Sequence, residues 1–175
     1  MPTFPVQWFE WMELNLPGGP FLRESVYGFS ILLTIHVISM CLFFGLILMM
    51  DLRLAGLGHK GTPPEEMQKR LFPWQMLGFV VVAVTGFLLF YSKPLTYYGK
   101  GFFWTKLVLM GLAGVNAGAI HLITHRAGGS GWDSGSAKLA GVMSIVLWAG
   151  VLITGRLVAY EWWTTEYIPG FIESE

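Results

Sequence analysis

Four long apolar stretches, separated by short polar segments, dominate the chain. They run from about residue 25 to 50, 72 to 91, 102 to 125 and 137 to 160. A helix needs about 20 mainly apolar residues to cross the hydrocarbon core of a bilayer, so each stretch is long enough for one transmembrane helix. Because the connections are short, neighbouring helices are expected to run antiparallel. The pattern predicts an all-α fold, an integral membrane four-helix bundle formed by residues 21–160.

The two ends of the chain have a different pattern. Residues 4–16 mix aromatic and aliphatic side chains with Gln7, Glu10 and Glu13, and a Pro-Gly-Gly-Pro turn follows. This predicts an amphipathic helix lying in the membrane interface within residues 1–20. The start carries neither a basic nor an apolar signal-peptide region, so we expect the first spanning helix to direct insertion. Residues 161–175 read as a polar and aromatic tail.

Composition supports membrane insertion. Hydrophobic residues make up 54% of the 175 residues and charged residues only 13%, whereas soluble domains carry roughly a quarter charged residues. The net charge is zero, and no nucleic-acid-binding motif is present, so we expect lipid and not nucleic acid as a partner. Cys41 is the only cysteine, which excludes an internal disulfide and a covalent CxxC haem attachment. We expect its thiol to be buried and inert.

The distribution of basic residues gives the expected orientation. Weighting basic residues in loops above those near helix ends places both termini on the outer side, which is the periplasm if the membrane is the bacterial inner membrane. The basic residues expected on the inner side are Arg53, Lys60, Lys69, Arg70, Arg126 and Lys138. Those expected on the outer side are Arg23, Lys93, Lys100, Lys106 and Arg156.

Two histidines within the spans are the first candidates for chemistry, because ionisable groups inside a bilayer are costly and mark functional sites. His36 stands in the first span and His121 late in the third. Neutral imidazole is a good ligand for haem iron, so the two predict a bis-histidine haem b. Gly114, Ala117 and Gly118 share a helix face with His121 and would admit a flat ring. The same small residues are also typical of close helix packing without a cofactor.

The depth of the two histidines leaves this pairing open. Counted from Arg23 and Lys106, His36 and His121 differ in depth by about 3 Å, but counted from the inner ends of their helices they differ by about 15 Å. Arg156, together with Lys106, would hold the haem propionates, since a guanidinium pairs well with a carboxylate. An arginine near a helix end also snorkels to the headgroups without any ligand.

A second metal site is possible in the same region. His121 and His125 are four residues apart, a helical spacing that can chelate a metal ion. His59 and Asp51 are expected on the same side of the membrane, which completes a candidate copper or zinc site with three nitrogens and one oxygen. In the remaining interpretation the histidines only form hydrogen bonds between helices.

Several short motifs together resemble a known family. They are His36 followed by Asp51-Leu52-Arg53-Leu54, then Leu71-Phe72-Pro73-Trp74 leading to Thr85-Gly86, then Gly141, Ser144 and the run from Gly155-Arg156 to Ala159-Tyr160. Over residues 20–160 the chain resembles a family of small bacterial four-helix inner-membrane proteins of unknown function. The histidine in the first span is also similar to one in CopD-type copper-resistance membrane domains and in small b-type cytochrome subunits. These resemblances imply haem or copper as the group to test first.

The sequence therefore predicts a haem b-binding electron-transfer subunit, part of a larger respiratory or redox complex in the bacterial inner membrane, and not a stand-alone enzyme. His36 and His121 would be the axial ligands, and quinone or another protein the electron partner. The alternatives are a copper-handling membrane protein and a cofactor-free accessory or anchor subunit that docks a partner protein.

Overall fold

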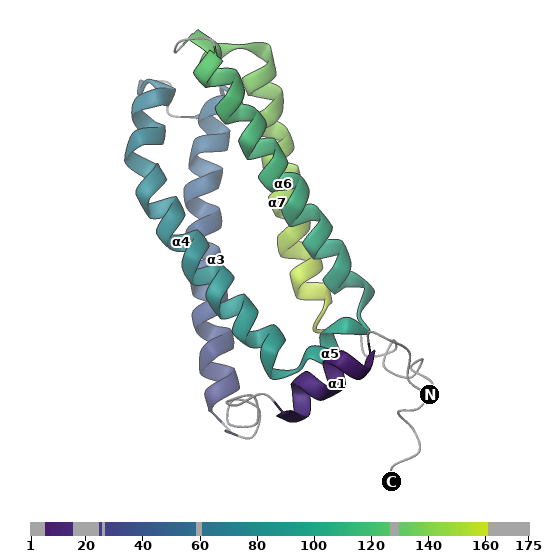
Figure 1. Ribbon diagram of the computed structural model, residues 1–175. Coiled ribbons are helices and arrows are strands. Elements are labelled where there is room, and N and C mark those ends of the chain that lie inside the picture. The colour runs from purple at the N-terminus through teal and green to yellow at the C-terminus, as the bar shows by residue number, and fades with distance from the viewer. Residues whose placement is uncertain (1–5, 16–24, 26, 59–60, 127–129, 161–175) are drawn as a thin grey trace.

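The chain forms a bundle of long helices (Figure 1). The structure is a computed structural model that describes residues 6–15, 25, 27–58, 61–126 and 130–160. In this part of the chain every regular element is a helix, which confirms the all-α prediction. The elements are α1 (Val6–Asn15), α3 (Gly28–Leu54), α4 (Pro64–Ser92), α5 (Pro94–Tyr98), α6 (Gly101–Arg126), the 3₁₀ helix η1 (Ser130–Asp133) and α7 (Gly135–Leu157).

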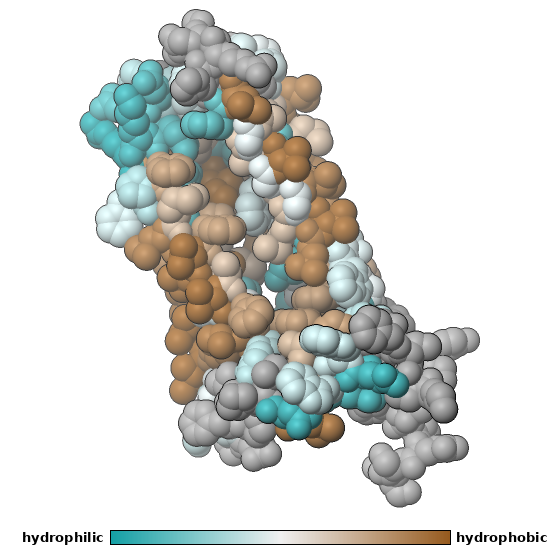
Figure 2. Space-filling view, in the orientation of Figure 1, coloured by the Kyte–Doolittle hydropathy of each residue, from teal (hydrophilic) through white to brown (hydrophobic). Residues whose placement is uncertain are grey.

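Four of these helices, α3, α4, α6 and α7, are long and apolar enough to cross a membrane. Large apolar side chains such as Leu42, Val80, Val115 and Val146 are exposed on them, and Figure 2 shows brown, hydrophobic atoms along the flanks of the bundle. Exposing such a surface to water is costly, whereas exposing it to the acyl chains of lipids is not. The protein is therefore a multi-pass membrane protein whose apolar helix faces contact the bilayer.

The four spans pack as two pairs. α3 packs along α4, α6 packs along α7, and contacts between α3 and α7 join the pairs. This joint is tightest at Gly141 of α7, where a Cβ atom would lie 2.9 Å from Leu54 Cβ and 3.0 Å from the Asp51 carbonyl oxygen of α3. Only glycine permits this approach, because the atoms it meets belong to the backbone and to a Cβ atom, and neither can move aside.

The second span starts earlier than the sequence predicted. α4 begins at Pro64, not near residue 72, and Pro73 lies inside the helix, not near its first turn. Pro64 occupies the start of the helix, where its missing N–H costs little, and Glu65 and Glu66 stand in the first turn, where the helix dipole favours acids. The prediction was wrong here because hydropathy does not detect a polar extension of a spanning helix.

Helices α1 and α5 lie side by side at the end of the bundle where α3 and α6 begin (Figure 1). The Phe9 ring of α1 contacts the Tyr98 ring of α5, with 4.8 Å between the ring centroids. A helix was predicted in residues 4–16 and is confirmed as Val6–Asn15. The predicted tail, residues 161–175, lies outside the described residues. Cys41, expected to be buried, is exposed on α3.

Candidate functional site: two cavities of opposite charge

A cavity of about 320 Å³ lies between the helix pairs, at the end of the bundle where α3 and α6 begin. Its lining combines apolar and aromatic side chains with a histidine and three lysines, namely His36, Lys93, Lys100 and Lys106. We call it the lysine cavity. The described lining contains no aspartate or glutamate, so the ammonium groups are not neutralised from within the cavity wall.

The three lysines differ in their local contacts. Lys100 Nζ donates a hydrogen bond to the Val158 carbonyl oxygen at 2.7 Å. Lys93 Nζ lies 4.8 Å from the centroid of the Phe29 ring, a cation–π distance. Lys106 comes from within the third span.

Lys106 reaches the cavity beside Gly155 of α7, where a Cβ atom would stand 3.5 Å from Lys106 Nζ. Among the described residues its ammonium group has no ion pair with an acid. Lys106 is therefore the cation of the lysine cavity whose charge is least compensated.

His36 is buried and held in one tautomer by its neighbours. Its Nδ1 atom lies 2.8 Å from Thr85 Oγ1, and the Thr85 hydroxyl is 2.7 Å from the Val81 carbonyl oxygen, to which it must donate. Thr85 Oγ1 can therefore only accept from His36, which places the proton on Nδ1 and the lone pair on Nε2.

The imidazole ring of His36 packs directly against Gly86 of α4. A Cβ atom at this position would lie 3.1 Å from His36 Cε1, so any larger residue would push the ring out of place. The resulting arrangement, with one nitrogen donating to an oxygen and the other carrying a free lone pair, is the one that metal-binding histidines use.

Tyr97 of α5 adds a neutral donor to the lysine cavity. Burial raises the pKa of its phenol above the usual value, because an apolar environment disfavours the phenolate. The hydroxyl group therefore stays protonated at neutral pH and can donate a hydrogen bond to an anion.

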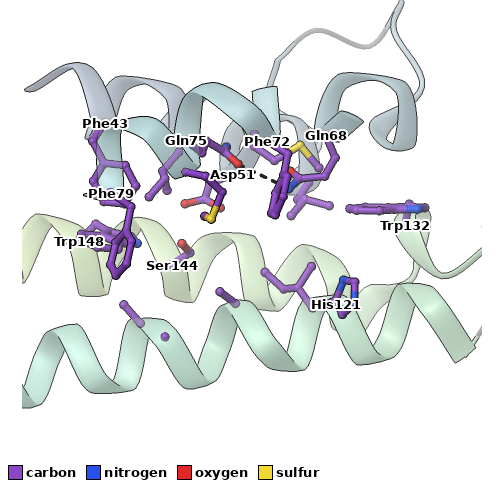
Figure 3. Close-up of a pocket in the computed structure, with 18 residues that line it drawn as sticks. Phe43, Asp51, Gln68, Phe72, Gln75, Phe79, His121, Trp132, Ser144 and Trp148 are labelled. Atoms are coloured by element: carbon purple, nitrogen blue, oxygen red, sulfur yellow. Dashed lines mark hydrogen bonds between the residues drawn. The ribbon is translucent and has the colours of Figure 1, made fainter. Parts of the chain in front are cut away.

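A second cavity, of about 400 Å³, lies toward the opposite end of the bundle (Figure 3). All four spans contribute polar side chains to its lining, with Asp51 from α3, Gln75 from α4, His121 from α6 and Ser144 from α7. We call it the aspartate cavity. Its described lining contains no lysine or arginine, so it holds an acid where the lysine cavity holds bases.

The structure does not bring His36 and His121 together. His36 follows the start of α3 by eight residues, whereas His121 follows the start of α6 by 20. Both helices start at the same end of the bundle, and at 1.5 Å per residue the two depths are about 12 Å and about 30 Å. His36 lines the lysine cavity and His121 the aspartate cavity. A haem ligated by this pair does not fit the arrangement.

Lys106 and Arg156, the two residues expected to hold haem propionates, also lie in different places. Lys106 lines the same cavity as His36, whereas Arg156 is not among the lining residues. Its guanidinium donates a hydrogen bond to the Tyr160 hydroxyl at 2.7 Å and stacks over the Tyr160 ring.

The predicted copper ligands are only partly described. Asp51 and His121 line one cavity, but His59 lies outside the described residues, as does the side chain of His125. Within the described part of the chain, no group of three or more His, Cys, Asp or Glu side chains could hold a metal ion.

Sequence reasoning missed several residues of the lysine cavity. In the sequence, Lys93 and Lys100 contribute only to the expected membrane orientation. Thr85 and Gly86 contribute only to the family resemblance. One sequence feature does indicate this region: the Thr85-Gly86 pair interrupts an otherwise apolar run in the second span. A small polar residue beside a glycine at membrane depth indicates a close contact with a polar group on another helix.

Comparisons with known proteins give a family but no activity. No curated protein and no solved structure matches the chain. The model of a family of unknown function (DUF6644) matches residues 8–161, which include all four spans. The chain belongs to this family.

Proposed function

We propose that the protein binds an anionic molecule with an apolar body in the lysine cavity. The supporting observation is that three lysines and His36 converge on one cavity whose described lining contains no acid. Like charges gathered in a low-dielectric region are costly unless a counter-charge is present. A bound anion would offset this cost, and the aromatic and aliphatic part of the lining would contact its apolar body.

Haem b is the first candidate within this class. Its propionates would pair with the ammonium groups of Lys93, Lys100 and Lys106, and its flat ring is apolar. His36 would hold the iron through Nε2, while Thr85 keeps the proton on Nδ1. Iron bound in this way would supply one-electron transfer, which agrees with an electron-transfer subunit exchanging electrons with a quinone or a protein partner.

The coordination expected for such a haem differs from the bis-histidine form. The described lining of the lysine cavity contains no second histidine and no methionine or cysteine. Among the described lining residues, His36 is therefore the one that would hold the iron. An anionic lipid or a fatty acid also combines a negatively charged group with an apolar body and is the alternative occupant.

The test uses the full chain purified from cells supplied with haem and reconstituted in nanodiscs of neutral phosphatidylcholine. Absorption spectra are recorded before and after reduction, and native mass spectrometry detects bound molecules. The variants are His36→Ala and Lys106→Met, with Lys69→Met as the control, because Lys69 is exposed on α4 and pairs with Glu65 along its own helix.

If haem is the ligand, the wild type has a Soret band that His36→Ala abolishes, Lys106→Met weakens and Lys69→Met leaves unchanged. A colourless wild type contradicts haem. A bound anionic lipid that disappears in Lys106→Met but not in Lys69→Met would then still support an anion site. If no bound anion depends on Lys106, the proposal is wrong.

A further inference from the structure

The aspartate cavity contains a buried carboxylate that the protein itself does not neutralise. Asp51 is only 4% exposed, and its Oδ2 atom is buried without a hydrogen-bond partner among the described residues. Ser144 of α7 lines the same cavity. No lysine or arginine is among the described lining residues, and His121 is the only other titratable group there. A buried oxygen of this kind requires a partner from elsewhere.

The surroundings of Asp51 select the kind of partner. Phe43, Phe79 and Trp148 form an aromatic cluster beside the carboxylate (Figure 3), with 5.1 Å between the Phe43 and Trp148 ring centroids and 6.1 Å between those of Phe43 and Phe79. Aromatic faces attract cations and also cover apolar groups. An acid beside such a cluster can hold a cation that carries an apolar body.

The lining does not match a bare divalent metal ion. Hard divalent cations take about six to eight oxygen ligands, whereas the described polar oxygens of this cavity come from Asp51, Ser144 and the glutamines Gln68 and Gln75. A single carboxylate matches a single positive charge. The cavity volume of about 400 Å³ falls within the range of about 300 to 1,000 Å³ that is typical of small-molecule sites.

From these observations we infer that the aspartate cavity binds a monovalent organic cation, a protonated amine joined to an apolar group. The ammonium pairs with Asp51 Oδ2, and the apolar group lies against the aromatic cluster of Phe43, Phe79 and Trp148. This inference does not depend on the lysine cavity, because the two cavities share no lining residue.

The test is calorimetric titration of the full chain in neutral phosphatidylcholine nanodiscs. The probe is phenethylammonium, and the neutral control ligand is phenethyl alcohol, which has a similar size and shape but no charge. The main variant is Asp51→Asn, which keeps the shape of the side chain and removes its charge. Glu66→Gln is the matched control, because Glu66 is an exposed acid on α4 that pairs with Arg70.

The wild type is expected to bind phenethylammonium at one saturable site and more tightly than the alcohol. Asp51→Asn should weaken ammonium binding about tenfold or more, because a charge-assisted hydrogen bond is lost, and should leave alcohol binding unchanged. Glu66→Gln should match the wild type. Equal ammonium binding by Asp51→Asn and the wild type, or only non-saturable partitioning in the wild type, would overturn the inference.

A second variant covers the case in which Asp51→Asn does not fold. Trp148→Leu keeps the carboxylate and removes the largest ring of the aromatic cluster. Weaker phenethylammonium binding by this variant supports the site, since the contact between the phenyl group and the Trp148 ring is lost. Unchanged affinity in folded Trp148→Leu would overturn the cluster as the wall that holds the apolar group.

Discussion

The lysine cavity and the aspartate cavity occupy opposite halves of one bundle and treat buried charge differently. In the lysine cavity, Lys93 and Lys100 have local partners, the Phe29 ring and the Val158 carbonyl oxygen. In the aspartate cavity, Asp51 Oδ2 has no such partner among the described residues. Lys93 and Lys100 have long side chains that reach these groups, whereas the short side chain of Asp51 leaves one carboxylate oxygen dependent on what enters the cavity.

The two cavities also differ in how the backbone supports them. Gly141 brings α7 into backbone contact with α3 at Asp51, so the aspartate cavity depends on one tight helix crossing. The lysine cavity is lined by residues from the first turns of α3 and α6, from the last turns of α4 and α7, and from α5. Mutations should therefore affect the two cavities separately, and the following predictions run from the largest expected effect to the smallest.

The largest effect is expected for Gly141→Leu. The added side chain would meet backbone and Cβ atoms of α3 within about 3 Å, and such overpacking costs about 3 kcal/mol or more. Thermal unfolding in detergent, followed by circular dichroism, should show a large loss of stability. Gly118→Leu is the control, because a Cβ at Gly118 meets no atom within 4 Å, and equal losses in both variants would refute a tight crossing at Gly141.

Thr85→Val should destabilise the protein by about 1–2 kcal/mol, because the buried Nδ1–H of His36 loses its acceptor. Thr85→Ser keeps the hydroxyl and should stay close to the wild type. Both variants can be compared by thermal unfolding and by ligand binding to the lysine cavity. If valine and serine behave alike, the hydroxyl does not hold the imidazole.

A smaller effect is expected for Gly86→Ala, about 1 kcal/mol. The new methyl group would lie 3.1 Å from His36 Cε1, so the ring must shift by a few tenths of an ångström. Binding at the lysine cavity should weaken while phenethylammonium binding at the aspartate cavity stays unchanged. Parallel titrations with an anionic ligand of the lysine cavity and with phenethylammonium test this. A loss of affinity at both cavities would contradict the independence of the two cavities.

The smallest effect is expected for Glu65→Gln, about 0.5 kcal/mol or less. Glu65 and Lys69 form an exposed pair one turn apart on α4, at 2.9 Å, and exposed pairs of this kind contribute little. Neither cavity should lose affinity for its ligand. A stability loss of about 2 kcal/mol in thermal unfolding would show that the polar start of α4 matters more to the bundle than this account allows.

The sequence predicted the spans because hydropathy and length decide them. It did not predict the start of α4, because Glu65, Glu66, Lys69 and Arg70 are polar and the helix continues through them. It also singled out His36 as a residue of interest, but not its partner. Thr85 is 49 positions away, and only the packing of α3 on α4 brings the two together.

The depth of the histidines could not be settled from the sequence because the reference charges lie at different depths. Lys106 follows the start of α6 by five residues, within the span, while Arg23 precedes the start of α3. Counting from these two made His36 and His121 appear level. The count from the inner ends, which gave a large difference, agrees with the structure. The unpartnered oxygen of Asp51 could not be predicted either, because it depends on the contacts of all four spans.

The separation of charge between the two cavities is tested most directly by titrating the wild type, Lys106→Met and Asp51→Asn in neutral nanodiscs with two probes, phenethylammonium and laurate, an anion with an apolar chain. The account predicts that Lys106→Met loses affinity for laurate only and Asp51→Asn loses affinity for phenethylammonium only. If each variant lost both probes equally, or if neither variant changed the binding of either probe, the central claim would be contradicted.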